Sequence, residues 1–425
     1  NKVSQGSIID KVDTNTVITN NNKNTASSNT VTIEAKDEDD KVEVKLDNVN
    51  IDTSKQNKAA VSVTGSGDTT IELDGDNKLK SDSAHAGLEH NKTDTSGELT
   101  IQDKDNNGSL EAAGGFKGAG IGSAGSNDAQ VKITGGNITA TSDDWGAGIG
   151  SGSYGTGTVE ITGGEINATG GYLGAGIGGG AFSSPDKIGN GNVVIKDNAK
   201  IDNVQGGAYG AGIGGGIFGL SNVTIEGNTE FNAAGGTGGA GIGSGAGDAK
   251  ANITLEGKVT ITATAGKDNV AIGANGIEQE FSGLAEGSSI TRYDSEGNDI
   301  TLPTDPVPAV PSSSGGSSAD ASVQESVFPG LIVTDKDGQR ISYTSIRGNN
   351  VLSLRVGRFT ASLHASLSTL RQLRAEGIDT ITFQTILCST TLSVDELLAM
   401  GGEDAEVVLT HHIRSSTLTV GGKAV

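Results

Sequence analysis

The chain has 425 residues and a formal net charge of −22, which leaves room for two or three domains. Aromatic residues make up 3% of the chain, too few for the core of an ordinary globular protein, and the single cysteine, Cys388, excludes an internal disulfide. The acidic excess argues against nucleic acid and anionic membranes as partners, and no apolar run is long enough to be inserted into a membrane.

The first part of the chain shows strand periodicity. Residues 1 to about 30 are rich in Asn, Thr and Ser, and we expect them to be extended and to cap the fold that follows. Apolar and polar residues then alternate over residues 31–33, 42–46, 61–63 and 71–73. A period of two is typical of strands with one buried and one exposed face, so these segments predict irregular early coils of β structure.

The middle of the chain repeats one phrase, Gly-Ala-Gly-Ile-Gly. It begins at Gly118 and returns at Gly146, Gly174, Gly210 and Gly239, with steps of roughly 28, 28, 36 and 29 residues. Such periods are typical of solenoids, in which each repeat stacks on its neighbours. The glycines follow no strict triplet and proline is scarce, which excludes a collagen-like structure.

Two aliphatic ladders run in step with this phrase. The first consists of apolar pairs two residues apart: Leu99/Ile101, Val131/Ile133, Val159/Ile161, Val193/Ile195, Val223/Ile225 and Ile253/Leu255. The second consists of Leu110, Ile138, Ile166, Ile201, Phe231 and Ile261. Each repeat thus holds three short strands, separated by Gly-Gly, Gly-Asn or Asp-Asn pairs that allow tight corners. This predicts a mainly β fold over residues 1–302, a right-handed parallel β-helix with three short strands per coil.

The solenoid is predicted to end before a second domain. Residues 294–298, Asp-Ser-Glu-Gly-Asn, are a turn signal, so residues 281–302 are expected to form a hairpin that closes the open end. Residues 303–327 are rich in Pro, Ser and Gly and are predicted to be a linker. From Phe328 onward nine acidic and nine basic residues balance, so the whole negative excess lies before that residue. The change in charge marks residues 328–425 as a separate domain.

The C-terminal domain is predicted to be a small α+β unit. Strands over residues 331–334 and 341–344 flank an Asp-Lys-Asp-Gly turn, and strands over 380–385, 407–410 and 418–420 follow. Leucines at helical spacing predict one helix: Leu363, Leu367, Leu370 and Leu373. Ser393 opens a second, short helix with a capping box.

Several phrases of the solenoid resemble a known family. They are Leu-Asp-Asn-Val-Asn-Ile at residues 46–51, Ala-Ala-Val at 59–61, Ile-Glu-Leu-Asp-Gly-Asp-Asn at 71–77, His-Ala-Gly-Leu at 85–88, and the repeated Ile-Thr-Gly-Gly and Gly-Ala-Gly-Ile-Gly-Gly-Gly. Together they resemble the carbohydrate-binding β-helix family of clostridia and related gut Firmicutes. The resemblance implies a secreted or cell-surface protein of a gut bacterium, and an acidic polysaccharide of the polygalacturonate (pectin-like) type bound with calcium. The C-terminal domain resembles modules appended to gut-bacterial surface proteins.

The few aromatic residues of the solenoid fall in register with the repeat. Three lie four residues after the last glycine of their phrase, and four lie just before the phrase; they are Tyr154, Phe182 and Phe218, and Phe116, Trp145, Tyr172 and Tyr209. Rings in successive coils could stack on successive sugars, whose C–H faces suit aromatic planes. Alternatively, the rings pack on one another and fill corners. All of these residues except Phe116 are taken as candidate carbohydrate-binding residues.

Acidic residues are the candidate metal ligands, because calcium takes six to eight oxygen atoms. Asp103 and Asp105 open a loop that imitates the start of an EF-hand, but Gly114 stands where the bidentate glutamate is expected. Asp143 and Asp144 form the second candidate pair. Solvated turns are the alternative interpretation of both pairs, and calcium is the one candidate cofactor.

Catalysis is disfavoured, although many β-helices cleave pectin. A lyase needs a strong cation, and before residue 328 the chain has one arginine, Arg292, in the predicted closing hairpin. A hydrolase needs paired carboxylates at a fixed separation, whereas neighbouring residues on a strand face opposite ways. His411, His412 and Cys388 are interpreted as structural.

These observations predict a non-catalytic, extracellular or cell-surface protein of adhesin type that binds a bacterial, host or plant polysaccharide on one flank of the solenoid. A structural or adhesive stalk with a protein partner is the alternative, and a polysaccharide lyase or hydrolase comes last.

Overall fold

The structure is a computed structural model, and the chain divides into two compact units, Asn1–Val310 and Pro311–Val425. It describes residues 1–5, 8–11, 16–181, 189–197, 199–247, 249–306, 330–336, 338–341, 343–347, 350–356, 360–385, 389–402, 405–412 and 416–424. Among these residues no helix is long and apolar enough to cross a membrane.

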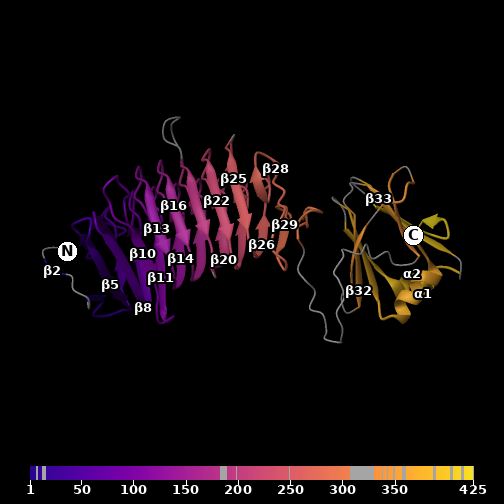
Figure 1. The fold of residues 1–425 in the computed structure, drawn as a ribbon, viewed down its shortest axis with the longest axis horizontal. Coiled ribbons are helices and arrows are strands. Elements are labelled where there is room, and N and C mark those ends of the chain that lie inside the picture. Colours follow the sequence, from indigo (N-terminus) through magenta and orange to yellow (C-terminus); the bar gives the residue numbers. More distant parts are fainter. Residues whose placement is uncertain are drawn as a thin grey trace. The chain divides into compact units, whose positions relative to one another are not determined.

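The first unit is a β-helix whose strands stack into three sheets (Figure 1). Sheet 1 contains β2 (Ile8–Lys11), β1 (Lys2–Gln5), β4 (Val31–Ala35), β7 (Val61–Gly65), β9 (Leu88–Glu89), β12 (Ile121–Gly122), β15 (Ile149–Gly150), β18 (Ile177–Gly178), β21 (Ile213–Gly214), β24 (Ile242–Gly243), β27 (Ile272–Ala274) and β28 (Ile277–Glu278). Sheet 2 contains β3 (Val17–Thr19), β5 (Lys41–Asp47), β8 (Asp68–Lys80), β10 (Leu99–Gln102), β13 (Ala129–Ile133), β16 (Gly157–Ile161), β19 (Gly191–Ile195), β22 (Ser221–Glu226) and β25 (Ala251–Glu256). Sheet 3 contains β6 (Asn50–Asp52), the second half of β8, β11 (Gly108–Ala113), β14 (Asn137–Thr141), β17 (Glu165–Thr169), β20 (Lys200–Gln205), β23 (Thr229–Ala234), β26 (Val259–Thr264) and β29 (Ser289–Tyr293).

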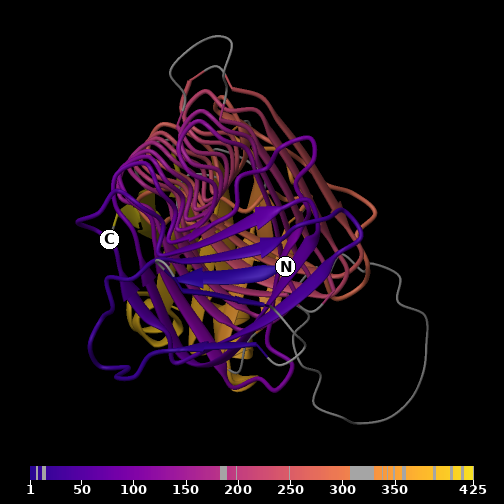
Figure 2. The same cartoon turned by 90° about the vertical axis from the view of Figure 1, so that its left-hand side faces the viewer.

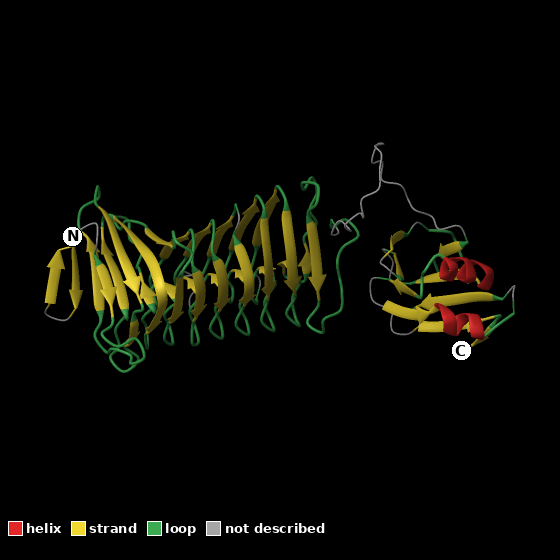
Figure 3. Cartoon of the chain, turned by 90° about the horizontal axis from the view of Figure 1, so that it is seen from below, coloured by secondary structure: helices red, strands yellow, loops and turns green. Residues whose placement is uncertain are grey.

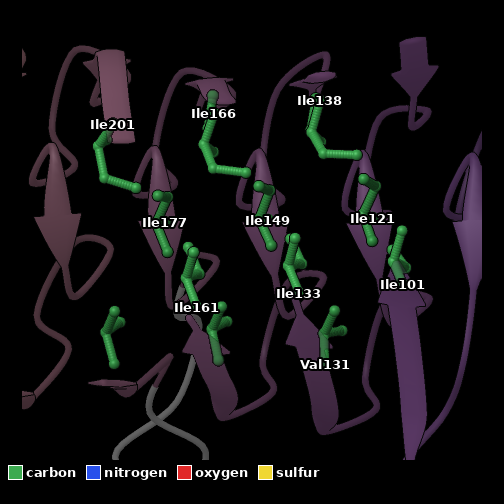
Figure 4. Close-up of a cluster of buried hydrophobic side chains, with 14 of the residues drawn as sticks. Ile101, Ile121, Val131, Ile133, Ile138, Ile149, Ile161, Ile166, Ile177 and Ile201 are labelled. Carbon is green, nitrogen blue, oxygen red and sulfur yellow. The ribbon is translucent and has the colours of Figure 1, made fainter. Parts of the chain in front are cut away.

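Aliphatic side chains stack because each coil places the same kind of residue at the same strand position. In sheet 1, Ile121 lies opposite Ile149, and Ile149 lies opposite Ile177. The equivalent pairs in sheets 2 and 3 are also in register and parallel, and the ladders form one buried core (Figure 4). These ladders confirm the predicted parallel β-helix with three short strands per coil. Seen from its N-terminal end, the loops of successive coils lie behind one another (Figure 2).

Both ends of the β-helix are covered by other parts of the chain. At the N-terminal end β1 pairs antiparallel with β4, so the first residues do form a cap. At the other end β29 leads into the predicted hairpin, with Tyr293 bridged to Asp299. The first residues of the predicted linker belong to this end, because the N–H of Ile290 donates to the carbonyl of Pro306 at 2.8 Å. The rest of that linker, from residue 307, lies outside the described residues.

The second unit combines two sheets with two helices, shown in red in Figure 3. The five-stranded sheet contains β30 (Leu331–Thr334), β33 (Ala361–Ser366), β36 (Glu406–His411), β37 (Ser416–Val420) and β38 (Lys423–Ala424). The four-stranded sheet contains β31 (Thr344–Arg347), β32 (Val351–Arg355), β34 (Thr380–Gln384) and β35 (Ser389–Ser393). The helices are α1 (Leu367–Ala375) and α2 (Val394–Ala399).

The predicted helical stripe of the second unit was one residue too long. Leu367, Leu370 and Leu373 are buried on α1, but Leu363 lies in β33, opposite Leu409. Ser366 sets the boundary, because its side chain accepts the backbone N–H of Thr369 and so caps the first turn. Ser393 caps α2 in the same way, as predicted.

Candidate functional site

Each coil makes a sharp return where it passes through sheet 1. The N–H of Ala147 donates to the carbonyl of Ser151 at 2.9 Å, and Ala119 and Ser123 form the same bond one coil earlier at 3.1 Å. The segments before and after the two-residue strand are therefore joined. This brings residues from both sides of the glycine phrase to one corner of the β-helix, which we call the aromatic corner: Phe116, Trp145, Tyr154, Tyr172, Tyr209 and Phe218.

The first three rings of the aromatic corner pack on one another. The Phe116 and Trp145 ring centroids are 5.0 Å apart, and Trp145 meets Tyr154 edge to face at 5.8 Å. The Nζ atom of Lys117 lies 5.3 Å from the Trp145 ring centroid. Trp145 and Tyr154 are half-buried, so for these two candidates the corner-filling interpretation describes what the rings do.

Tyr172 and Tyr209 form a second, more open pair on the next two coils. Their ring planes are nearly perpendicular, with centroids 5.4 Å apart, and 54% and 37% of the two residues are exposed. The Tyr209 N–H donates to the Tyr172 carbonyl at 3.1 Å, which fixes the two backbones side by side. A hydrogen bond to Tyr209 raises the pKa of the Tyr172 hydroxyl. Because both residues are partly exposed, ring surface is available to a ligand at this pair.

Phe218 occupies a backbone conformation that L-residues rarely adopt. Its φ is +58°, and the equivalent residues Tyr154 and Ser126 have φ values of +65° and +69°. The next coil has glycine at this position, Gly247, with a φ of +94°. Phe218 is nevertheless 46% exposed, so burial of its ring offsets only part of the strain. The remaining candidate of this row, Phe182, lies outside the described residues.

A carboxylate, that of Asp144, lies near Tyr172, and Asp143 is its neighbour in the same loop. Asp143 and Asp144 precede Trp145 in the loop after β14, and the carbonyl of Asp144 accepts the N–H of Leu173 at 2.9 Å. Burial, and to a lesser degree the charge of Asp143, raises the pKa of Asp144. The sequence predicted that the rings would recur in register with the repeat and that Asp143 and Asp144 would lie next to Trp145, but it carried no signal that Asp144 would adjoin Tyr172 of the following coil.

The two acidic pairs proposed as metal ligands are at different corners. Asp103 and Asp105 lie between β10 and β11, and the Asp103 side chain accepts the N–H groups of Asn107 and Gly108 at 3.2 and 2.9 Å. Asp103 therefore holds its own turn in place. Within the described part of the chain no three His, Cys, Asp or Glu side chains gather as a metal site would need. Calcium binding stays a prediction.

Sequence reasoning missed the polar contacts of two histidines in the early coils. His85 Nδ1 lies 2.8 Å from the buried carboxylate of Glu89. His90 is buried, with Nε2 2.9 Å from the carbonyl of Gly97 and Nδ1 3.3 Å from that of Val63. Beside it is a cavity of about 290 Å³ whose lining is rich in hydroxyl groups: Ser62, Thr64, Ser66, Thr93, Thr95 and Ser96.

The two histidines should give the β-helix opposite pH dependences. The hydrogen bond to Glu89 raises the pKa of His85 above 6.5, so its contribution to stability is complete below pH 6.5 and is lost as pH rises through the folded-state pKa. Burial lowers the pKa of His90, so its contribution is present above pH 6.5 and is lost as pH falls through the folded-state pKa. We expect His85→Gln to flatten the alkaline side of a Tm-against-pH curve and His90→Gln the acidic side. Circular dichroism melts over about pH 4 to 9 check this; an unchanged curve in either variant contradicts it.

A polar relay in the second unit also went unpredicted. His364 Nδ1 is 3.0 Å from Glu406 Oε1, and its Nε2 is 3.1 Å from the Thr334 hydroxyl. The order carboxylate, imidazole, hydroxyl is that of a nucleophile and its base. However, 62% of the Glu406 side chain is exposed on this sheet face, where water weakens such electrostatic coupling.

His411 is buried between the hydroxyls of Thr385 and Thr390, and Cys388 lies outside the described residues.

Comparison with known proteins bears on the repeat. Residues 131–153 and 159–181 match the family model for the beta helix repeat. These two segments are similar to beta helix repeats, in agreement with the fold. Trp145 and Tyr172 lie within the matched segments, as does Tyr154 only by sequence neighbourhood, and the other residues of the aromatic corner lie outside them. Neither a curated protein nor a solved structure matches the chain significantly.

Proposed function

We propose that this β-helix protein binds polysaccharide at the aromatic corner and catalyses no reaction on it. The observation that carries the proposal is the set of three partly exposed rings on two neighbouring coils, Tyr172 on one coil and Tyr209 and Phe218 on the next. Neighbouring coils are separated by one strand spacing, about 4.8 Å. A glycan lying along the β-helix axis would then meet aromatic surface on successive coils, and sugar C–H faces pack well on such surfaces.

Backbone strain at Phe218 supports a role for this ring beyond packing. A left-handed φ costs a bulky residue roughly 1–2 kcal/mol, whereas glycine tolerates it. The next coil has a glycine, Gly247, at the equivalent position, where this φ causes no strain. A half-exposed ring held at such a position points to a function that outweighs the strain.

The setting proposed for this activity is outside the cell, as in the carbohydrate-binding β-helix family that the solenoid phrases resemble. A stalk that binds a protein partner is the alternative, favoured by the mutual packing of Phe116, Trp145 and Tyr154. Calcium assistance belongs to the proposal as well, and is tested by adding a chelator.

Substitutions in the aromatic corner test the binding site. We expect Tyr172→Ala, Tyr209→Ala and Phe218→Gly each to weaken polysaccharide binding roughly five-fold, because one stacked ring contributes about 1 kcal/mol. Phe218→Gly should leave the unfolding free energy within about 1 kcal/mol of the parent, since glycine relieves the strained φ. Binding is measured by calorimetry on ligands selected from a glycan array.

Tyr293→Ala is the matched control, because Tyr293 is a partly buried tyrosine of sheet 3 near the closing hairpin. It should bind like the parent protein. Binding to no glycan, with or without chelator, would favour the stalk. New reducing or unsaturated ends in the incubated polysaccharide would show that the protein is an enzyme.

A further inference from the structure

The described residues that flank the exposed tyrosine pair in the sequence, 133–181 and 201–247, carry no cationic side chain. No Lys, Arg or His occurs between Lys132 and Lys187 or between Lys200 and Lys250, which are the stretches that contain Tyr172 and Tyr209. Lys117, a cation of the aromatic corner, lies over the Trp145 ring. The charges beside the pair are therefore those of carboxylates.

Asp143 and Asp144 supply these carboxylates. Asp144 adjoins the tyrosine pair through its backbone bond to Leu173, and its negative charge also raises the pKa of the Tyr172 hydroxyl. Burial, and to a lesser degree the charge of Asp143, raises the pKa of Asp144, and among the described residues no basic side chain forms an ion pair with it. A ligand cation placed here would be attracted by Asp144 and by the faces of both rings.

The same charges oppose an acidic ligand. A uronate carboxylate at the tyrosine pair would meet the charge of Asp144, and residues 133–181 and 201–247 provide no basic side chain to balance it. Without a bridging cation such as calcium, the corner therefore disfavours the polygalacturonate-type ligand that the family resemblance implies. Charge complementarity selects the opposite kind of glycan.

We propose that the ligand of the aromatic corner is a glycan with free ammonium groups, of the glucosamine type, whose sugar rings stack on Tyr172 and Tyr209 while an ammonium group pairs with Asp144. This inference rests on the proposed glycan binding and adds the class of glycan. Ring stacking provides the contact area, and the ammonium–carboxylate pair with its cation–π contacts provides selectivity.

Three oligosaccharides of equal length test this inference: a glucosamine oligomer, the corresponding N-acetylglucosamine oligomer and an oligogalacturonate. Calorimetry is done at mildly acidic pH, below the pKa of the glucosamine amines, so that these groups are protonated. The glucosamine oligomer should bind the parent protein at least roughly ten-fold more tightly than the acetylated one. Asp144→Asn should remove most of this preference and leave binding of the acetylated oligomer unchanged.

Asp39→Asn is the matched control, since it removes the same charge from an exposed residue in the turn between β4 and β5, to which no binding role is assigned. It should bind all three oligomers like the parent. An equal loss in Asp39→Asn and Asp144→Asn would mean non-specific attraction to an acidic protein and would overturn the inference. Equal or tighter binding of the acetylated or uronate oligomer would overturn it too, while glycan binding itself stands. Binding of no oligomer or other glycan would remove both.

Discussion

Gly150→Ala is expected to destabilise the β-helix by more than about 3 kcal/mol, through a clash and a forbidden backbone conformation together. Gly150 has a φ of +134°, a region open only to glycine, and a Cβ atom there would lie 2.0 Å from the carbonyl oxygen of Gly178 in the next coil. That oxygen is backbone, so it moves only if the coils separate. A solenoid is stabilised by the interfaces between repeats, and the damage should therefore extend to both neighbouring coils. Thermal melts and coil-resolved hydrogen exchange measure it.

Gly276→Ala separates the clash from the backbone strain. Gly276 has a φ of +74° but no atom within 4 Å of a built Cβ. We expect it to cost only about 1 kcal/mol, the price of a left-handed alanine. Should the two variants melt alike, the close approach of coils at Gly150 would not be limiting.

The same column of glycines explains why the fold could be predicted from the sequence. Gly122, Gly178, Gly214 and Gly243 all have positive φ, and a Cβ on each would lie within about 2 Å of the next carbonyl. A constraint that recurs in every coil leaves a periodic trace in the sequence. The isoleucine that precedes each of these glycines is fully buried in the core. The glycine phrase and the isoleucine ladder therefore recur in the sequence with the same period.

Contacts between coils at the site leave no such trace. Packing of Trp145 on Tyr154, and the position of Asp144 beside Tyr172, depend on how a loop of one coil leans on the next. Periodicity predicted which residues share a corner, but not which rings would pack together and which would stay open. The relay of Thr334, His364 and Glu406 joins three strands whose pairing follows from the fold of the second unit, which has no repeat.

Arg292 is held by a network of contacts that the sequence did not predict. The sequence placed this residue in the closing hairpin, and it is fully buried in the closing end of the β-helix. Its Nε and Nη2 atoms donate to both carboxylate oxygens of Asp305 at 2.6 and 2.9 Å, Nη1 pairs with Glu278, and Nη2 also donates to the carbonyl of Gln279. Phe281 covers it, 5.8 Å from the guanidinium carbon. These contacts hold the closing hairpin, β28 and the residues after β29 together.

Arg292→Met should destabilise the β-helix by about 3–5 kcal/mol, because it leaves the buried Asp305 carboxylate without a partner. The closing end would then open and expose the last strands of the sheets, so self-association should rise as well. Thermal melts and light scattering after size exclusion measure the two effects. Adding Asp305→Asn should restore part of the lost stability, since it removes the unpaired charge.

Lys200→Met is the control. Lys200 also has two acidic partners, Glu165 and Asp202, but it is exposed on sheet 3. Its substitution should therefore cost no more than about 1 kcal/mol. Equal losses from Arg292→Met and Lys200→Met would mean that the closing end does not depend on this buried network.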